Sequence, residues 1–198
     1  MQACMPTLHP TEHRGYRELF AFSRSLSAHW EQLAERLPQT RAGPFREGAS
    51  AARELIGELE THAGAYDLHG KPAAQGLGNS IGMARAGLRN RFLEVNQAAR
   101  FALGEIAHVV SLLAYLRRVA ETRDDVRARD FSSGWLDRLE EVERQARGAA
   151  AELGADPDLA IEPYDPSPLG KAGQSVGAAL GAAGEWVDQQ VAKRGWDG

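Results

Sequence analysis

Apolar residues recur every three to four positions along several segments of the chain, which is the period of an α-helix that buries one side. The first predicted helix runs from about Thr11 to Leu37, because Pro10 precedes this segment and Pro38 follows it. Its apolar stripe consists of Leu19, Phe22, Leu26, Trp30, Leu33 and Leu37. The second predicted helix runs from about Arg46 to Tyr66, and its stripe consists of Ala52, Leu55, Leu59, Ala63 and Tyr66.

Two further helices are predicted in the middle of the chain. The segment from about Ser80 to Arg123 has no proline and forms either one helix of about 60 Å or two helices broken near Gly104, and we favour one long helix. Its stripe consists of Leu88, Val95, Ala102, Val109, Leu113, Leu116 and Ala120. The charged run Thr122 to Asp130 reads as a turn, after which Ser132 or Ser133 is expected to cap the next helix. That helix has a stripe of Trp135, Leu139, Val142, Ala146, Ala149 and Leu153.

Four prolines crowd the segment that follows, so we expect an extended strap across the bundle, anchored by Leu159, Ile161 and Tyr164. The last segment has a narrow stripe rich in alanine and glycine, which predicts an amphipathic helix packed on the bundle or on a partner. The predicted fold is therefore all-α, an antiparallel helical bundle of about four long helices with a proline-rich strap and an additional C-terminal helix. The expected parts are a loose N-terminus at 1–12, the bundle at 13–154, the strap at 155–172 and the C-terminal helix at 173–198.

Composition narrows the possible compartments and partners. A chain of 198 residues with 43% hydrophobic and 25% charged residues fits one globular domain. The single cysteine, Cys4, excludes an intrachain disulfide, and the first residues do not resemble a secretory signal. No window approaches about 18 apolar residues. We therefore expect a cytoplasmic protein for which membrane contact is unlikely, and the net charge of −4 indicates that nucleic acid is not a partner.

Polar residues that can bind a metal occur on helix faces that should be buried. Glu105 projects into the apolar stripe of the third helix, and His108 follows one turn later. Glu58 and His62 flank the stripe of the second helix, and His29 lies at the edge of the first. A buried carboxylate is costly unless it is paired, protonated or bound to a cation. These five residues are thus the candidates for a metal site.

The pair Glu105 and His108 resembles the Glu-x-x-His ligand motif of the ferritin-like di-iron and di-manganese carboxylate proteins. In that family, two helices with this motif alternate with two helices that each supply one glutamate. The resemblance implies iron or manganese, with oxygen or peroxide chemistry, held by His29, Glu58, His62, Glu105 and His108. The chain departs from the family pattern in three respects. Glu58 and His62 are four residues apart, His29 stands where the family has a glutamate, and the fourth helix has only Glu143, at the margin of its stripe.

The alternative is that the glutamates are bound by arginines and the histidines make ordinary interior hydrogen bonds, which fixes the register of the helices. The glutamates concerned are Glu58, Glu94 and Glu105, and the candidate arginines are Arg53, Arg91 and Arg100. No arrangement of residues in the sequence demands an enzyme. We therefore expect a non-catalytic bundle that acts through protein–protein contacts as an adaptor, scaffold or self-associating unit, with a ferritin-like metal-binding bundle as the alternative.

Overall fold

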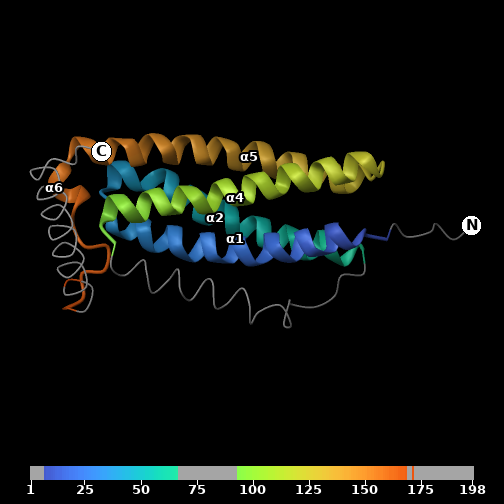
Figure 1. Ribbon diagram of the computed structural model, residues 1–198, viewed down its shortest axis with the longest axis horizontal. Coiled ribbons are helices and arrows are strands. Elements are labelled where there is room, and N and C mark those ends of the chain that lie inside the picture. The colour runs from blue at the N-terminus through green and yellow to red at the C-terminus, as the bar shows by residue number, and fades with distance from the viewer. Residues whose placement is uncertain (1–6, 67–92, 169–170, 172–198) are drawn as a thin grey trace, which may run out of the picture.

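The computed structural model describes residues 7–66, 93–168 and 171, and most of them lie in four long helices (Figure 1). These helices are α1 (Pro10–Arg36), α2 (Gln39–Gly64), α4 (Val95–Thr122) and α5 (Val126–Ala151). A short 3₁₀ helix, η1 (Glu152–Ala155), and a short helix, α6 (Pro157–Ala160), follow α5. Within the described ranges the only β-type pairing is an isolated bridge between Glu94 and Pro163. The prediction of an all-α helical bundle is confirmed.

The contacts between helices give their directions. Short turns join α1 to α2 and α4 to α5, so each of these pairs is antiparallel (Figure 1). The hydroxyl of Thr11, at the start of α1, is hydrogen-bonded to the hydroxyl of Tyr115 near the end of α4. Trp30, near the end of α1, donates its indole N–H to the carbonyl of Ala102 near the start of α4. Helix α1 is therefore antiparallel to both α2 and α4.

Helix α2 ends at one end of the bundle, and α4 begins at the other end. Tyr66, just after α2, is hydrogen-bonded to Asp125 at the start of α5, whereas the carbonyl of Leu93, just before α4, accepts from Tyr164 at the opposite end. Helices α2 and α4 therefore run in the same direction.

The core is built around Trp30, whose side chain is fully buried. Its ring lies 5.1 Å from the ring of Phe45 on α2, and its N–H bond to Ala102 ties it to α4. Gly48 of α2 lies directly against the indole, because a Cβ at this position would be 2.3 Å from two atoms of the Trp30 ring. The other large side chains that are fully buried are Leu19, Leu26, Leu33, Leu55, Ile106, Leu113, Leu116, Leu136, Leu139 and Leu153.

The first helix agrees with the prediction, but the second begins earlier than expected. Helix α2 starts at Gln39 and not at Arg46, so Pro44 lies inside it. Proline removes one helical hydrogen bond and crowds the preceding turn. Here the segment stays helical because Ala42 and Phe45, on either side of the proline, are fully buried in the core. The predicted start at Arg46 was therefore wrong.

The third helix is shorter than the predicted single helix from Ser80. It begins at Val95, because Glu94 has an extended backbone and its carboxylate accepts a hydrogen bond in a capping box with Gln97. Gly104 lies within the helix, so the alternative break at this residue is also wrong. The part of the predicted helix before Leu93 lies outside the described residues.

The fourth helix starts at Val126, before the predicted caps. Asp125 is its N-cap, and the carboxylate of this residue accepts from the backbone N–H of Ala128. Ser132 is buried inside the helix and Ser133 also lies within it, so neither serine is a cap. Sequence reasoning preferred the serines because the run before them is charged, but Asp125 already supplies the capping oxygen.

The predicted strap differs from a fully extended segment, because its first part forms η1 and α6. Tyr164 is buried and Leu159 is partly buried against the core, as expected of anchors. Ile161 is 56% exposed, so its prediction as an anchor was wrong. The expected C-terminal helix at 173–198 and most of the expected loose N-terminus, together with Cys4, fall outside the described residues.

Helix α4 is long and apolar enough to cross a membrane, judged by length and composition within the described residues. The expectation that no window of the chain is this apolar was therefore wrong. Core helices of water-soluble bundles meet the same criterion, and α4 packs between α1 and α5. Only 33% of the apolar window is buried, however, so much of this helix faces outward.

Candidate functional site

His29 and Glu105, two of the predicted metal ligands, form a pair between α1 and α4. Nδ1 of His29 lies 2.8 Å from Oε2 of Glu105. The histidine is 8% exposed, whereas the glutamate side chain is 22% exposed and lies at the edge of the helix interface. The rings of His29 and Tyr164 form a T-shaped pair, with their centroids 5.9 Å apart and their planes at 88°. The expectation that Glu105 lies in the apolar core is corrected: it lies at the α1–α4 boundary.

His108 follows Glu105 by one helical turn but has different partners. Its Nε2 lies 2.9 Å from Oε1 of Glu18, and its ring lies 4.1 Å from the ring of Phe22, both on α1. The histidine is exposed, as is typical of a surface ion pair. The two residues of the Glu-x-x-His motif therefore make separate contacts with α1.

Glu58 and His62 also separate from each other. Glu58 is exposed and accepts a hydrogen bond from the indole N–H of Trp135 on α5, over 2.9 Å. His62 lies near one end of the bundle, beside Tyr16 of α1 and Phe131 of α5. The five predicted ligands thus occupy four places, and within the described ranges no group of three or more His, Cys, Asp or Glu side chains is arranged to hold a metal ion. Metal binding by the chain stays a prediction.

The arginine partners expected in the alternative hypothesis are also different. Arg53 pairs with Glu31 over 3.0 Å, and Arg100 donates to the side chain of Asn96. Glu105 is held by a histidine, and Arg91 lies outside the described residues. The bonds of Glu105, His108 and Glu58 each join two helices. That these side chains fix the register of the helices stays a prediction.

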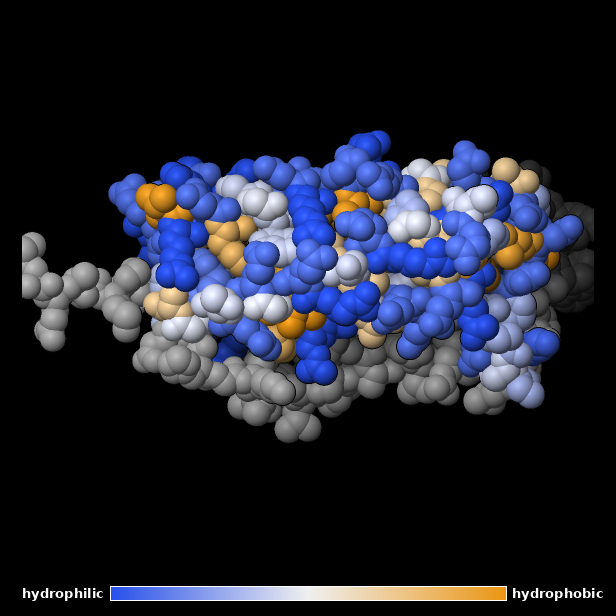
Figure 2. All heavy atoms as spheres, turned by 180° about the vertical axis from the view of Figure 1, so that it is seen from behind, coloured by the Kyte–Doolittle hydropathy of each residue, from blue (hydrophilic) through white to orange (hydrophobic). Residues whose placement is uncertain are grey.

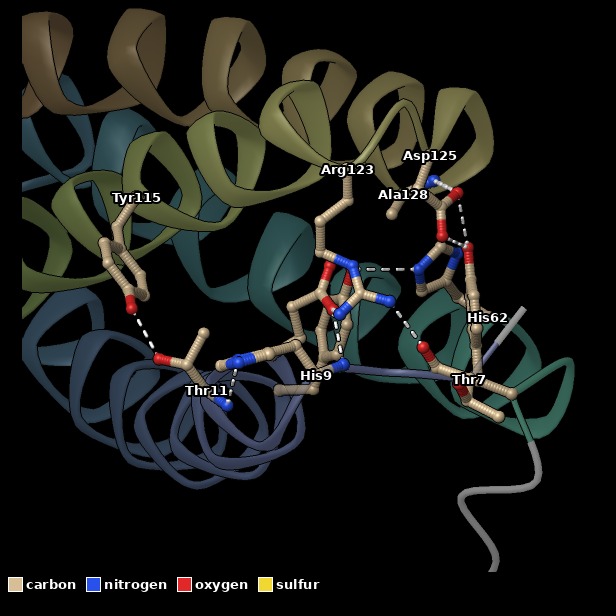
Figure 3. Close-up of polar contacts among 11 residues, drawn as sticks. Thr7, His9, Thr11, His62, Tyr115, Arg123, Asp125 and Ala128 are labelled. Atoms are coloured by element: carbon tan, nitrogen blue, oxygen red, sulfur yellow. Dashed lines mark hydrogen bonds and ion pairs between the residues drawn. The ribbon is translucent and has the colours of Figure 1, made fainter.

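A second polar cluster, which sequence reasoning did not find, joins the ends of all four long helices (Figure 3). Its first part surrounds Glu12, a carboxylate in the first turn of α1 that is 1% exposed. Oε2 of Glu12 accepts from the backbone N–H of His9 over 2.7 Å and lies 3.3 Å from the guanidinium of Arg123. Arg123, at the end of α4, also donates to the carbonyl of Thr7 over 2.6 Å. The cluster therefore fastens α4 to the start of α1.

The second part of this cluster surrounds Asp125, the N-cap of α5. Its two carboxylate oxygens each lie 2.9 Å from the hydroxyl of Tyr66, which follows α2, and one of them also accepts from Ala128 N–H. Burial and the Asp125 carboxylate raise the pKa of Tyr66, so the phenol keeps its proton and donates. A single carboxylate thus caps one helix and holds the end of another.

The third part lies deeper and surrounds His62 of α2. Its ring is stacked on Phe131 of α5 at 4.1 Å, and its Nε2 lies 3.1 Å from the hydroxyl of Tyr16 on α1. Burial, with Arg127 nearby, lowers the pKa of His62 to about 4. Burial also raises the pKa of Tyr16, with nearby Tyr66 adding to the effect. At neutral pH both groups are uncharged, and the bond between them is a neutral hydrogen bond.

The chemistry of this cluster is that of a structural fastening. Its contacts join the ends of the helices. Oε1 of Glu12 is buried and has no hydrogen-bond partner among the described residues. The sequence contained one local signal, the glutamate three residues after His9, which is the spacing of a capping box. The long-range partners left no signal, because Thr7 and Arg123 are 116 residues apart.

No protein-family model matches the chain, and no curated protein and no solved structure matches it either.

Proposed function

We propose that the chain is a non-catalytic helical bundle that acts through contacts with protein partners, as an adaptor, a scaffold or a self-associating unit. The observation that supports this proposal is the outward side of α4. Phe101 is 50% exposed and Tyr115 is 47% exposed, although large aromatic side chains are usually buried. They are 14 residues apart, about four helical turns, and so lie on the same side of the helix.

The surface between these two aromatic residues has little charge. From Phe101 to Leu116 the helix has one carboxylate, Glu105, and no lysine or arginine. Both Glu105 and His108 are paired with side chains of α1. Exposed aromatic residues on a surface with few charges are typical of the centres of protein interfaces.

The opposite side of the bundle is more hydrophilic. Seen from behind, the described surface consists mainly of hydrophilic residues with scattered hydrophobic ones (Figure 2). Helix α5 contributes ion pairs such as Arg144 with Glu141, and Arg138 bridges to Glu47 and Glu54 of α2. Scattered apolar residues of this kind are normal for a solvated surface. The contrast favours α4 as the contact surface.

A ferritin-like metal-binding bundle is the second candidate. Two observations favour it: α2 and α4 run in the same direction, as in ferritin-like bundles, and His29 and Glu105 form an imidazole–carboxylate pair. Iron or manganese would need further ligands, and the other predicted ligands lie elsewhere. The first candidate therefore has the better support.

Photo-cross-linking through α4 tests the proposed contact. A benzoylphenylalanine placed at Tyr115 is expected to trap a protein partner in an extract of the cells from which the protein comes. The matched control is the same residue at Glu60, an exposed position of α2. An adduct from position 115 but not from position 60 supports the proposal. No adduct from position 115, or equal adducts from both, would contradict it.

A further inference from the structure

We propose that His62 and Tyr66 form a pH-sensitive latch, in which a proton on His62 releases the last turn of α2 from α1 and α5. The other end of the bundle stays closed when the latch opens. The latch lies where α2 meets α1 and α5, so it is independent of the proposed contact through the outward side of α4.

The ring of His62 is enclosed by aromatic side chains and is 5% exposed. Phe131 of α5 is stacked on it at 4.1 Å, and the ring centroids of Tyr16 and Tyr66 each lie 5.2 Å away. Nε2 of His62 lies 3.1 Å from the hydroxyl of Tyr16. A neutral imidazole fits these surroundings, whereas a buried cation is costly unless it is paired.

The charged groups at this end of the bundle do not supply a partner for a charged His62. Arg127 of α5 is close enough to oppose a positive charge on the ring. The carboxylate of Asp125, also on the α5 side, accepts from the Tyr66 hydroxyl and from a backbone N–H. On the α1 side, the carboxylate of Glu12 is engaged with a backbone N–H and with Arg123, which follows α4. The two tyrosine phenols beside His62 keep their protons, because burial raises the pKa of each.

Two other histidines that join long helices differ from His62 in this respect. Nδ1 of His29 lies 2.8 Å from a carboxylate oxygen of Glu105, and Nε2 of His108 lies 2.9 Å from one of Glu18. A proton on either of these rings would face a carboxylate and would not be an unpaired charge. Acid is therefore expected to loosen the end of α2 and to preserve the contacts between α1 and α4.

Few other side chains hold the last turn of α2. Leu59 is the last residue of α2 in the main apolar core, and the buried side chains that follow it among the described residues are His62 and Tyr66. Tyr66 belongs to a small separate cluster with Ala120 and Ala128. When a charged His62 leaves its partners, this cluster and the hydroxyl bond of Tyr66 are what remains. A segment with so few apolar contacts can open without unfolding the rest of the protein.

The pH range of opening follows from the two states of His62. In the closed state, burial and nearby Arg127 lower the pKa of His62 to about 4, whereas in the open state the ring takes up its proton near pH 6.5. Closure is therefore fully favoured above pH 6.5 and weakens as the pH falls from 6.5 to 4. Between pH 7 and pH 5 the equilibrium constant for opening is expected to rise at least about fivefold.

Amide hydrogen exchange of the full chain, measured by NMR, tests the latch. The protection factors of the amides of residues 61–64 are expected to fall at least about fivefold between pH 7 and pH 5, after correction for the pH dependence of the chemical exchange rate. These amides are expected to exchange faster than those of core residues such as Ile106. Their exchange is also expected to be insensitive to low concentrations of urea, which is characteristic of local opening.

Variants of two histidines make the test specific. His62→Gln is expected to abolish the fall in protection at the end of α2, because the titrating group is gone. The matched control is His29→Gln, which removes a histidine that has a carboxylate partner and is expected to retain the fall. His62→Phe tests the same point with a ring of similar size, in case glutamine disturbs the packing. Circular dichroism checks that each variant keeps its helices.

Four results would overturn the latch. They are equal protection of residues 61–64 at pH 7 and pH 5, a fall that persists in both His62→Gln and His62→Phe, a fall that His29→Gln also removes, and exchange with the same urea dependence as the core amides. The last result would show that the end of α2 opens only when the whole bundle unfolds.

Discussion

Trp30 and Gly48 touch across the interface between α1 and α2 so closely that residue 48 has no room for a side chain. A Cβ at this position would lie 2.3 Å from two carbons of the indole and 3.2 Å from a methyl carbon of Val142. The indole is fixed by its hydrogen bond to Ala102, so it cannot move aside without losing that bond. This relationship sets the spacing of three helices around one side chain.

Gly48→Ala is therefore expected to destabilise the bundle by about 1–3 kcal/mol, the usual cost of overpacking a core. The opposite sign is expected for Gly57→Ala on the same helix, because its Cβ enters open space and alanine favours the helix by about 0.5–1 kcal/mol. Urea unfolding followed by circular dichroism measures both changes. Equal effects of the two variants would contradict the packing argument.

Asp125 serves two helices, so its removal should cost more than the loss of one bond. Asp125→Ala removes the N-cap of α5 and the acceptor of Tyr66, and we expect a loss of about 2 kcal/mol. Tyr66→Phe removes only the hydroxyl and is expected to cost about 1 kcal/mol. In the double variant the shared bond is lost once, so the sum of the single effects should exceed the measured effect. Strict additivity would show that the two residues are not coupled.

The low pKa of His62 predicts a pH dependence of stability. The folded chain holds this histidine neutral down to about pH 4, whereas the unfolded chain binds the proton near pH 6.5. The contribution of His62 is thus fully present above pH 6.5 and is lost as the pH falls from 6.5 to 4. Since the ring is not wholly shielded from solvent, we expect a loss of about 1–2 kcal/mol.

His62→Gln removes the titrating group but keeps a polar side chain near Tyr16. Its free energy of unfolding is expected to fall less between pH 7 and pH 4.5 than that of the wild-type chain. Urea unfolding at these two pH values measures the difference. The two proteins are otherwise identical, so the remaining pH dependence cancels in the comparison. Identical pH profiles would show that His62 is not responsible.

Metal content separates the two candidate functions. A protein–protein contact module is expected to contain much less than one metal ion per chain when it is purified without a histidine tag and analysed for iron, manganese and zinc. Its melting temperature is expected to stay unchanged on addition of these metals. Stoichiometric iron or manganese that disappears in the double variant Glu105→Ala/His108→Ala would instead support the ferritin-like candidate.

Local patterns were sufficient to predict the helices but not all of their ends. Helix α1 has a clear apolar stripe between two prolines, so the hydrophobic period and the prolines indicated the same helix boundaries. In α2 the two signals differ at Pro44. The segment is helical despite this proline, because Phe45 is buried in the core. The start of α4 depends on Glu94, a less usual cap than serine, threonine, asparagine or aspartate. A rule based on common caps therefore missed it.

The polar contacts were harder to predict because they depend on how the helices rotate against each other. Glu105 is on the apolar side of α4 by sequence, but a small rotation places it at the boundary, within reach of His29. The bundle-end cluster joins Tyr16 to His62 and Tyr66 to Asp125. Such partners become adjacent only after the fold sets the order of the helices. A single sequence contains no local pattern for this order.

The four long helices form two helical hairpins, α1 with α2 and α4 with α5, and residues 67–92 of the sequence lie between the hairpins. A cut anywhere in residues 67–92 leaves each hairpin covalently whole, with α1 and α2 in one fragment and α4 and α5 in the other. The side-chain bonds of Arg123 with Thr7 and of Trp30 with Ala102 would still connect the fragments. The protein can therefore be split between the two hairpins into complementary fragments, each of which completes the core of the other.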